Sequence, residues 1–167
     1  MRALTAALAV LAGCNALEYR PPAWDPPPRA TVSSGCVELT AAVMVDGVGK
    51  VPGIPLRISF HSTCKEPAPL DLGRVRVLAR LASGAWVALG AYDPEKSMHS
   101  GLLAPDDVGD EPIEYQQASS ALAGWEAVCV NFDAVRPDQP MVAGAVVCFD
   151  RRGTILDIEG PGDGGAP

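Results

Sequence analysis

Short stretches of the chain alternate hydrophobic and polar residues, a pattern that predicts half-buried β-strands. Two of them, residues 126–133 (EAVCVNFD) and 141–150 (MVAGAVVCFD), are separated by a turn-forming segment at 136–140 (RPDQP). An antiparallel hairpin with Cys129 opposite Cys148 places the apolar residues of both strands on one face. The facing pairs are then Val130 with Val147, Val128 with Phe149, and Phe132 with Ala145. Because a slip of one residue would destroy this match, the register and a Cys129–Cys148 disulfide support each other.

Residues 73–92 (GRVRVLARLASGAWVALGAY) predict another hairpin, with Ser83 and Gly84 as a two-residue loop. The pairs in this register are Leu81 with Trp86, Ala79 with Ala88, and Val75 with Tyr92. A basic strip forms on the other face, from Arg74, Arg76 and Arg80. Such a strip is either a site for an anionic partner or lipid headgroups, or the solvated face of an antiparallel sheet. We expect the solvated face.

Two further segments, 36–45 (CVELTAAVMV) and 54–62 (IPLRISFHS), are strand-like, and the remaining cysteines Cys36 and Cys64 pair by elimination. Placing these cysteines opposite each other sets Val43 against Arg57 and Leu39 against His61. The apolar faces then disagree. Two alternatives stay open: a bulge in the strand pair, or strands in different sheets joined by a bridge across the core.

Residues 93–121 lack clear alternation. Within them, residues 106–111 (DDVGDE) cluster carboxylates around a glycine. Their spacing differs from that of an EF-hand calcium loop, so we expect a solvated loop and no metal site. Residues 114–122 fit either a short helix or an edge strand.

The segment Leu122–Val130 (LAGWEAVCV) resembles the entry into a late strand of immunoglobulin-like and fibronectin-like sandwiches. Trp125 takes the place of the corner aromatic in this resemblance. Together with the repeated short strands and turns, it predicts an all-β fold, an antiparallel, immunoglobulin-like β-sandwich over residues 35–160.

The first fourteen residues (MRALTAALAVLAGC) have a basic start, an apolar middle and small residues before a cysteine, which is the layout of an export signal. The apolar run is shorter than the roughly 20 residues that span a bilayer. Leu11-Ala12-Gly13-Cys14 resembles the lipobox of bacterial lipoproteins at all four positions. The alternative is an ordinary apolar helix followed by a core thiol.

The lipoprotein resemblance implies that residues 1–13 are a signal peptide and that Cys14 becomes the first residue of the mature chain. Cys14 would carry diacylglycerol and a further acyl chain such as palmitate, and two or three chains hold a protein firmly to a membrane. Asn15 stands where the family's inner-membrane retention signal has Asp. The resemblance therefore favours the outer membrane.

The segment after Cys14 has five prolines in the eight positions from Pro21 to Pro28. Proline fixes φ and removes hydrogen-bond donors, so residues 14–34 are expected to form an extended tether between the anchor and the sandwich. A ligand for a partner, using Tyr19 and Trp24, is the alternative. Residues 161–167 are expected to be a flexible tail.

The chain has 167 residues and a formal net charge of −7. This length suits one domain, and the negative charge disfavours nucleic-acid binding, which needs a basic face. Four cysteines remain after Cys14, and an even number in a chain expected to be exported suggests two disulfides, with three possible connectivities.

Residues for catalysis are scarce, because the chain has two histidines, His61 and His99, and lacks the common nucleophile, zinc and phosphate-loop motifs. We therefore expect no enzyme, no cofactor and no metal. The alternatives weighed are a copper site from His99 with Met98, Met44 and Met141, and a hydrolytic carboxylate pair, Asp107 with Glu111.

The sequence thus predicts a cell-envelope lipoprotein whose sandwich is a non-catalytic binding or structural module for an envelope protein or a glycan. An accessory lipoprotein subunit of a larger envelope assembly, such as the outer-membrane lipoproteins of type VI secretion, is the second hypothesis. A hydrolase is the third.

Overall fold

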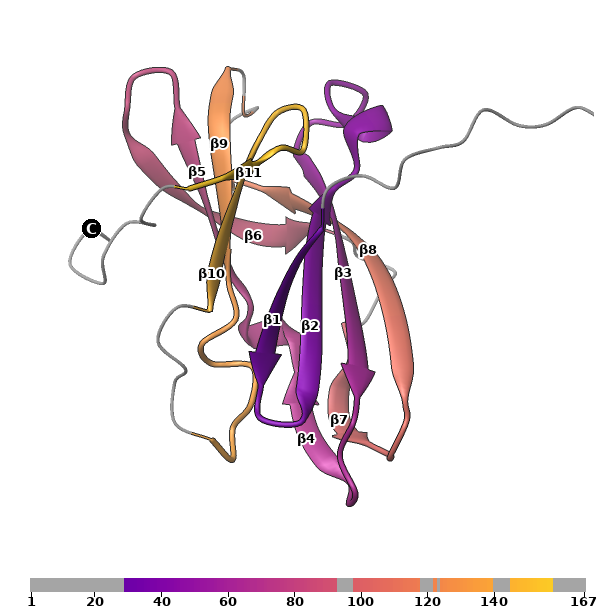
Figure 1. Ribbon diagram of the computed structural model, residues 1–167. Helices are drawn as coiled ribbons and strands as arrows, with labels where there is room; N and C mark the ends of the chain where they lie inside the picture. The colour runs from indigo at the N-terminus through magenta and orange to yellow at the C-terminus, as the bar shows by residue number, and fades with distance from the viewer. Residues whose placement is uncertain (1–28, 93–97, 118–121, 123, 140–144, 158–167) are drawn as a thin grey trace, which may run out of the picture.

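The computed structural model shows an all-β protein built from antiparallel strands (Figure 1). It describes residues 29–92, 98–117, 122, 124–139 and 145–157. The strands are β1 (Ala30–Ser34), β2 (Val37–Val43), β3 (Ile54–Ser62), β4 (Ala68–Asp71), β5 (Arg76–Leu81), β6 (Trp86–Tyr92), β7 (Ser100–Leu103), β8 (Val108–Gln116), β9 (Trp125–Asn131), β10 (Val146–Asp150) and β11 (Ile155–Leu156). Two short 3-10 helices, η1 (Val45–Gly47) and η2 (Leu72–Arg74), lie in connections. No helix among the described residues is long and apolar enough to cross a membrane.

Nine strands form one strongly bent sheet in the order β1-β2-β3-β8-β6-β5-β9-β10-β11, and β4 pairs with β7 in a small second sheet. The bend lies in β6. Residues 86–89 of β6 pair with β5, whereas residues 90–92 pair with β8. β6 therefore belongs to both halves of a sandwich, and Figure 1 shows it crossing between them.

The order of neighbouring strands corresponds to that of immunoglobulin-like sandwiches. β2, β3, β8 and the end of β6 take the positions of strands A, B, E and D, and β5, β9 and β10 take those of C, F and G. Trp125 begins β9, the F position, which is the place that the resemblance gives to the corner aromatic, and its side chain is buried. The prediction of an antiparallel β-sandwich is confirmed.

The sandwich begins earlier than predicted. β1 pairs along its whole length with β2, from Ala30 opposite Ala41 to Ser34 opposite Val37. Residues 30–34, which we assigned to the tether, are therefore folded. The cause is that a polar edge strand such as ATVSS buries few side chains and carries little hydrophobic pattern of its own.

The predicted register of the β9–β10 hairpin is confirmed. Cys129 lies opposite Cys148, with Val130 opposite Val147 and Val128 opposite Phe149. The backbone N–H of Phe132 donates to the carbonyl of Ala145 at 3.0 Å, which continues the same register beyond the strands.

The predicted register of the β5–β6 hairpin is wrong by one residue. Ala79 lies opposite Val87 and Leu78 opposite Ala88. The N–H of Leu81 bonds the carbonyl of Ala85 at 2.9 Å, so the loop has three residues, ending at Gly84 with φ of 83°. A three-residue hairpin loop commonly ends with a residue in this left-handed conformation, which glycine adopts without strain.

β2 and β3 are neighbours in one sheet without a bulge, so neither alternative for these strands is correct. Their register sets Leu39 opposite Phe60 and Val43 opposite Leu56, which matches the apolar faces. Cys36 therefore faces Thr63, whose N–H and hydroxyl both bond the Cys36 carbonyl at 2.8 Å. The disulfide to Cys64 joins diagonal positions just beyond the strand ends.

β8 overturns most of the expectation for residues 106–111 and for residues 114–122. Asp106 and Asp107 lie in an exposed loop, as expected, but the strand begins at Val108. Residues 108–116 form one strand in the middle of the sheet, between β3 and β6, and not a loop followed by a helix or an edge strand. Ile113 and Tyr115 point into the core, and Glu111 lies on the same face, opposite the buried Ile58, whereas Asp110 and Glu114 lie on the outer face. Few apolar residues mark this strand because its outer face is solvated.

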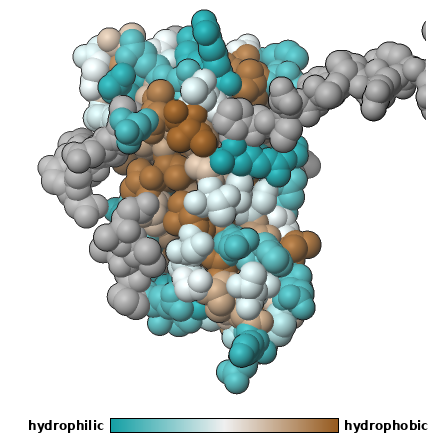
Figure 2. Space-filling model, viewed as in Figure 1, coloured by the Kyte–Doolittle hydropathy of each residue, from teal (hydrophilic) through white to brown (hydrophobic). Residues whose placement is uncertain are grey.

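One continuous core fills the space between the two halves of the sandwich. Its largest fully buried side chains are Tyr115, Phe132, Phe149, Leu39, Ile54, Leu56, Ile58, Leu70, Leu72 and Leu103. Hydrophobic side chains also reach the surface, and Figure 2 shows them gathered over β10 and β11. Ile155 of β11 and Val45 of η1 are the exposed large ones nearest this region.

Candidate functional site

Both predicted disulfides are present. Cys129 and Cys148 are joined with an S–S distance of 2.04 Å, and Cys36 and Cys64 with one of 2.01 Å. The first closes the β9–β10 hairpin and the second the β2–β3 pair, so each disulfide lies within one half of the sandwich. Cys14, the predicted lipidation site, lies outside the described residues.

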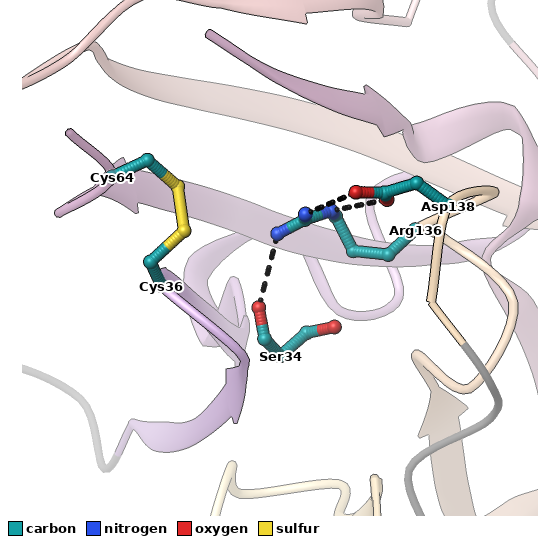
Figure 3. A network of polar contacts seen from close by, with 5 residues as sticks. All are labelled: Ser34, Cys36, Cys64, Arg136 and Asp138. Carbon is teal, nitrogen blue, oxygen red and sulfur yellow. Dashed lines mark hydrogen bonds and ion pairs between the residues drawn. A yellow bond between two sulfur atoms is a disulfide. The ribbon is translucent and has the colours of Figure 1, made fainter. Parts of the chain in front are cut away.

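A buried arginine, Arg136, joins the β9–β10 connection to the β1–β2 hairpin (Figure 3). Its side chain is 4% exposed and binds the Asp138 carboxylate through two nitrogens, at 2.9 and 2.7 Å. A third nitrogen donates to the carbonyl of Ser34 at 3.2 Å. The hydrogen bond from Arg136 lowers the pKa of Asp138. All three guanidinium nitrogens of Arg136 therefore donate hydrogen bonds, as a buried cation requires, and the pair with Asp138 has a structural role.

His99 and the acidic segment do come together. The backbone N–H of His99 donates to Glu111 Oε1 at 2.9 Å, and its ring lies 5.2 Å from the ring of Phe60. The ring atom Nε2 is buried and bonds no described residue. The Glu111 carboxylate therefore accepts a hydrogen bond from the backbone of His99 and not from its ring.

The Met98 sulfur accepts a hydrogen bond from the Tyr115 hydroxyl, at a donor–sulfur distance of 4.0 Å. Burial, and to a lesser degree the Glu111 charge, raises the pKa of Tyr115. Met44 lies elsewhere, bonding Pro55 near the start of β3 through its backbone N–H. Met141 lies outside the described residues. The copper alternative thus loses Met44, and the described part of the chain contains no group of three or more His, Cys, Asp or Glu side chains that could hold a metal ion.

The other carboxylates of the acidic segment also have structural partners. Asp107 Oδ2 accepts the N–H of Ala104 at 2.7 Å. Asp110 accepts the Ser59 hydroxyl at 2.8 Å and lies 3.4 Å from Arg57. Asp107 and Glu111 thus bond separate parts of the backbone, which leaves the hydrolytic pair without geometric support.

Arg76 and Arg80 lie on β5 as predicted, whereas Arg74 lies in η2, so the expected strip is not continuous along the sheet. All three arginines are paired with carboxylates, as expected for a solvated face. Arg74, Arg76 and Arg80 pair with Asp71, Asp133 and Glu126, at 3.2, 3.7 and 3.5 Å. Each pair is at least partly exposed and contributes little to stability. The strip offers no concentrated positive charge to an anionic ligand.

A small cavity of about 180 Å³ opens where the chain enters β1. Its lining combines two guanidinium groups, from Arg29 and Arg57, with the apolar residues at the end of β2 and the carboxylate of Asp46. The cavity is too small for a large organic ligand but has room for a compact anionic group.

Comparisons of the chain with protein-family models, with curated proteins and with solved structures find no match.

Sequence reasoning missed two of these features. The turn-forming segment RPDQP gives no sign that Arg136 is buried, because its contact with the Ser34 carbonyl joins positions 102 residues apart. The Arg29–Arg57 cavity had no sequence signal, because 27 positions separate its two arginines and only the β1–β2–β3 pairing brings them together.

Proposed function

We propose that this protein is a bacterial cell-envelope lipoprotein, anchored through acylated Cys14, whose β-sandwich is a non-catalytic binding or structural module. The observation that carries the proposal is the pairing of all four cysteines after Cys14. Paired cysteines persist in exported proteins and are rare in the cytosol. The lipobox resemblance supplies the anchor, and Asn15 favours the outer membrane.

The absence of catalysis in this proposal is supported by how the polar groups are used. Glu111, Asp107 and Asp110 hold backbone or hydroxyl groups, and the arginine strip is paired with carboxylates. A catalytic site needs a base or nucleophile aimed at free space. A rigid, doubly bridged sandwich presents loops and edges to an envelope protein or a glycan instead.

The proposal is tested by the intact mass of the protein purified from its native membrane fraction and alkylated without reduction. We expect loss of residues 1–13, an added lipid mass on Cys14 and no alkylated thiol. Cys14→Ser is the control, and it should abolish the lipid mass while leaving both disulfides intact. An unprocessed chain with reactive thiols would contradict the proposal.

A further inference from the structure

The chain enters the sandwich at one end, called here the tether end: Arg29, residues 44–53 between β2 and β3, and residues 150–155 around the β10–β11 turn. Ala30 pairs with Ala41 near the last residue of β2, so β1 starts at this end. The β10–β11 turn lies at the same end, because a Cβ at Gly153 would lie 3.2 Å from Val45 Cγ2. Both halves of the sandwich thus meet where the predicted tether joins.

The two ends of the sandwich differ in charge. The tether end carries four basic residues, Arg29, Lys50, Arg151 and Arg152, and two acidic ones. The strand ends beside it add Arg80, Glu114 and Glu126, which makes five basic and four acidic residues. The opposite end, residues 63–67, 104–107 and 132–139, carries two basic and five acidic residues. The protein is negative overall, so this excess of basic groups at one end is a local feature that orients it near a charged surface.

Exposed apolar side chains accompany the basic residues. Val45 is 42% exposed and Ile155 is 46% exposed, and both belong to the tether end. The cavity lined by Arg29 and Arg57 opens beside Val45. Because Arg57 is paired with Asp110 at 3.4 Å, the cavity adds one basic residue, Arg29, to this surface. Basic groups around exposed apolar residues are the composition with which proteins contact the headgroup region of a membrane.

We infer that the tether end docks on the anionic headgroups of the membrane that holds the anchor. This inference rests on the proposed lipidation of Cys14. Fourteen residues separate Cys14 from Arg29, and even fully extended they reach about 50 Å at most. A domain confined so close to the bilayer needs only weak attraction to dock, and the acidic opposite end is turned away from the surface.

The test uses the chain without residues 1–13 and with Cys14→Ser, so that no acyl chain contributes. Its binding is measured by flotation with vesicles of phosphatidylcholine alone and of phosphatidylcholine mixed with phosphatidylglycerol. We expect binding to the mixed vesicles that weakens as salt is added. A double variant, Lys50→Ser with Arg152→Ser, should bind about 25-fold more weakly, at roughly fivefold for each basic residue removed near an anionic surface.

The matched control removes one lysine and one arginine elsewhere, as Lys65→Ser with Arg74→Ser, and should bind like the parent. Val45→Ser provides a second variant that tests the apolar contact without changing the charge, and it should bind the mixed vesicles more weakly than the parent. Equal binding to both vesicle types, no binding, or equal loss in the control would each overturn the inference. Because this protein carries no lipid, such a failure leaves the mass test of Cys14 unaffected.

Discussion

Arg136 shows how a single buried charge is satisfied in this fold. Its guanidinium group bonds Asp138, which is two residues away, and the Ser34 carbonyl, which is 102 residues away in the chain. The short-range partner neutralises the charge, and the long-range one ties the β9–β10 connection to the first hairpin. Arg136 therefore stabilises the docking of these two segments.

Replacing Arg136 by methionine should lower the free energy of unfolding by about 2 kcal/mol at pH 7, because it removes the buried hydrogen bond to the Ser34 carbonyl and the pairing with Asp138. Asp138 has a lowered pKa in the folded state, so its pairing with Arg136 stabilises above its ordinary pKa near 4. That contribution is lost as the pH falls through the folded-state pKa. The difference between wild type and variant should therefore shrink at pH 3, as measured by urea titration.

Arg76→Met is the control for this prediction. Arg76 pairs with Asp133 at 3.7 Å but its side chain is half exposed, so the variant should lose less than about 1 kcal/mol. An Arg136→Met variant as stable as this control would mean that Arg136 is not a structural tie.

At the scale of strands, the two halves of the sandwich set their registers in different ways. In the β9–β10 hairpin, the apolar pattern and the Cys129–Cys148 disulfide require the same register. In the β2–β3 pair, the apolar faces set the register. Cys36 then faces Thr63, and the disulfide joins Cys36 to the next residue, Cys64. Burial of a strand face therefore outweighs direct opposition of two cysteines.

Removing the disulfide of the β9–β10 hairpin with Cys129→Ala and Cys148→Ala should lower the free energy of unfolding by about 3 kcal/mol. The sequence separation of 19 residues sets this magnitude through the entropy of loop closure in the unfolded chain. Thermal and urea unfolding of the oxidised proteins measure the difference. The single variant Cys129→Ala should be destabilised similarly, and an unchanged melting temperature would argue against a stabilising disulfide.

At the scale of the whole molecule, the two halves are joined by β6 and by their shared core, and neither disulfide crosses between them. Apolar side chains from β2, β3 and β8 pack with those from β5, β9 and β10 in one cluster. Such a core predicts that the two halves unfold together.

Leu56→Ala tests this cooperativity. Leu56 is fully buried in β3, so the truncation should lower the free energy of unfolding by about 2–5 kcal/mol. The Cys129–Cys148 disulfide, in the other half, should become reducible at the same lower urea concentration as Cys36–Cys64. A disulfide in β9–β10 that stays protected while Cys36–Cys64 is reduced would show that the halves unfold separately.

The sequence alone determined the strand-rich architecture and one complete hairpin, because strand side chains alternate with period two and the β9–β10 segments are close in the chain. The tertiary structure decided the central position of β8 and the burial of Arg136. It also decided the registers of the β2–β3 and β5–β6 pairs. β8 is marked by two buried core residues, Ile113 and Tyr115, and its identity as a strand depends on β3 and β6 on either side.

The candidate site follows the same division. The predicted lipidation of Cys14 and the two disulfides could be inferred from the sequence, because a lipobox and a disulfide framework each need specific residue types. The tether end could not be inferred from the sequence, because its basic residues at positions 29, 50, 151 and 152 are spread along the chain. They share one surface because β1 pairs with β2, and the β10–β11 turn then packs against Val45, contacts between segments far apart in the chain.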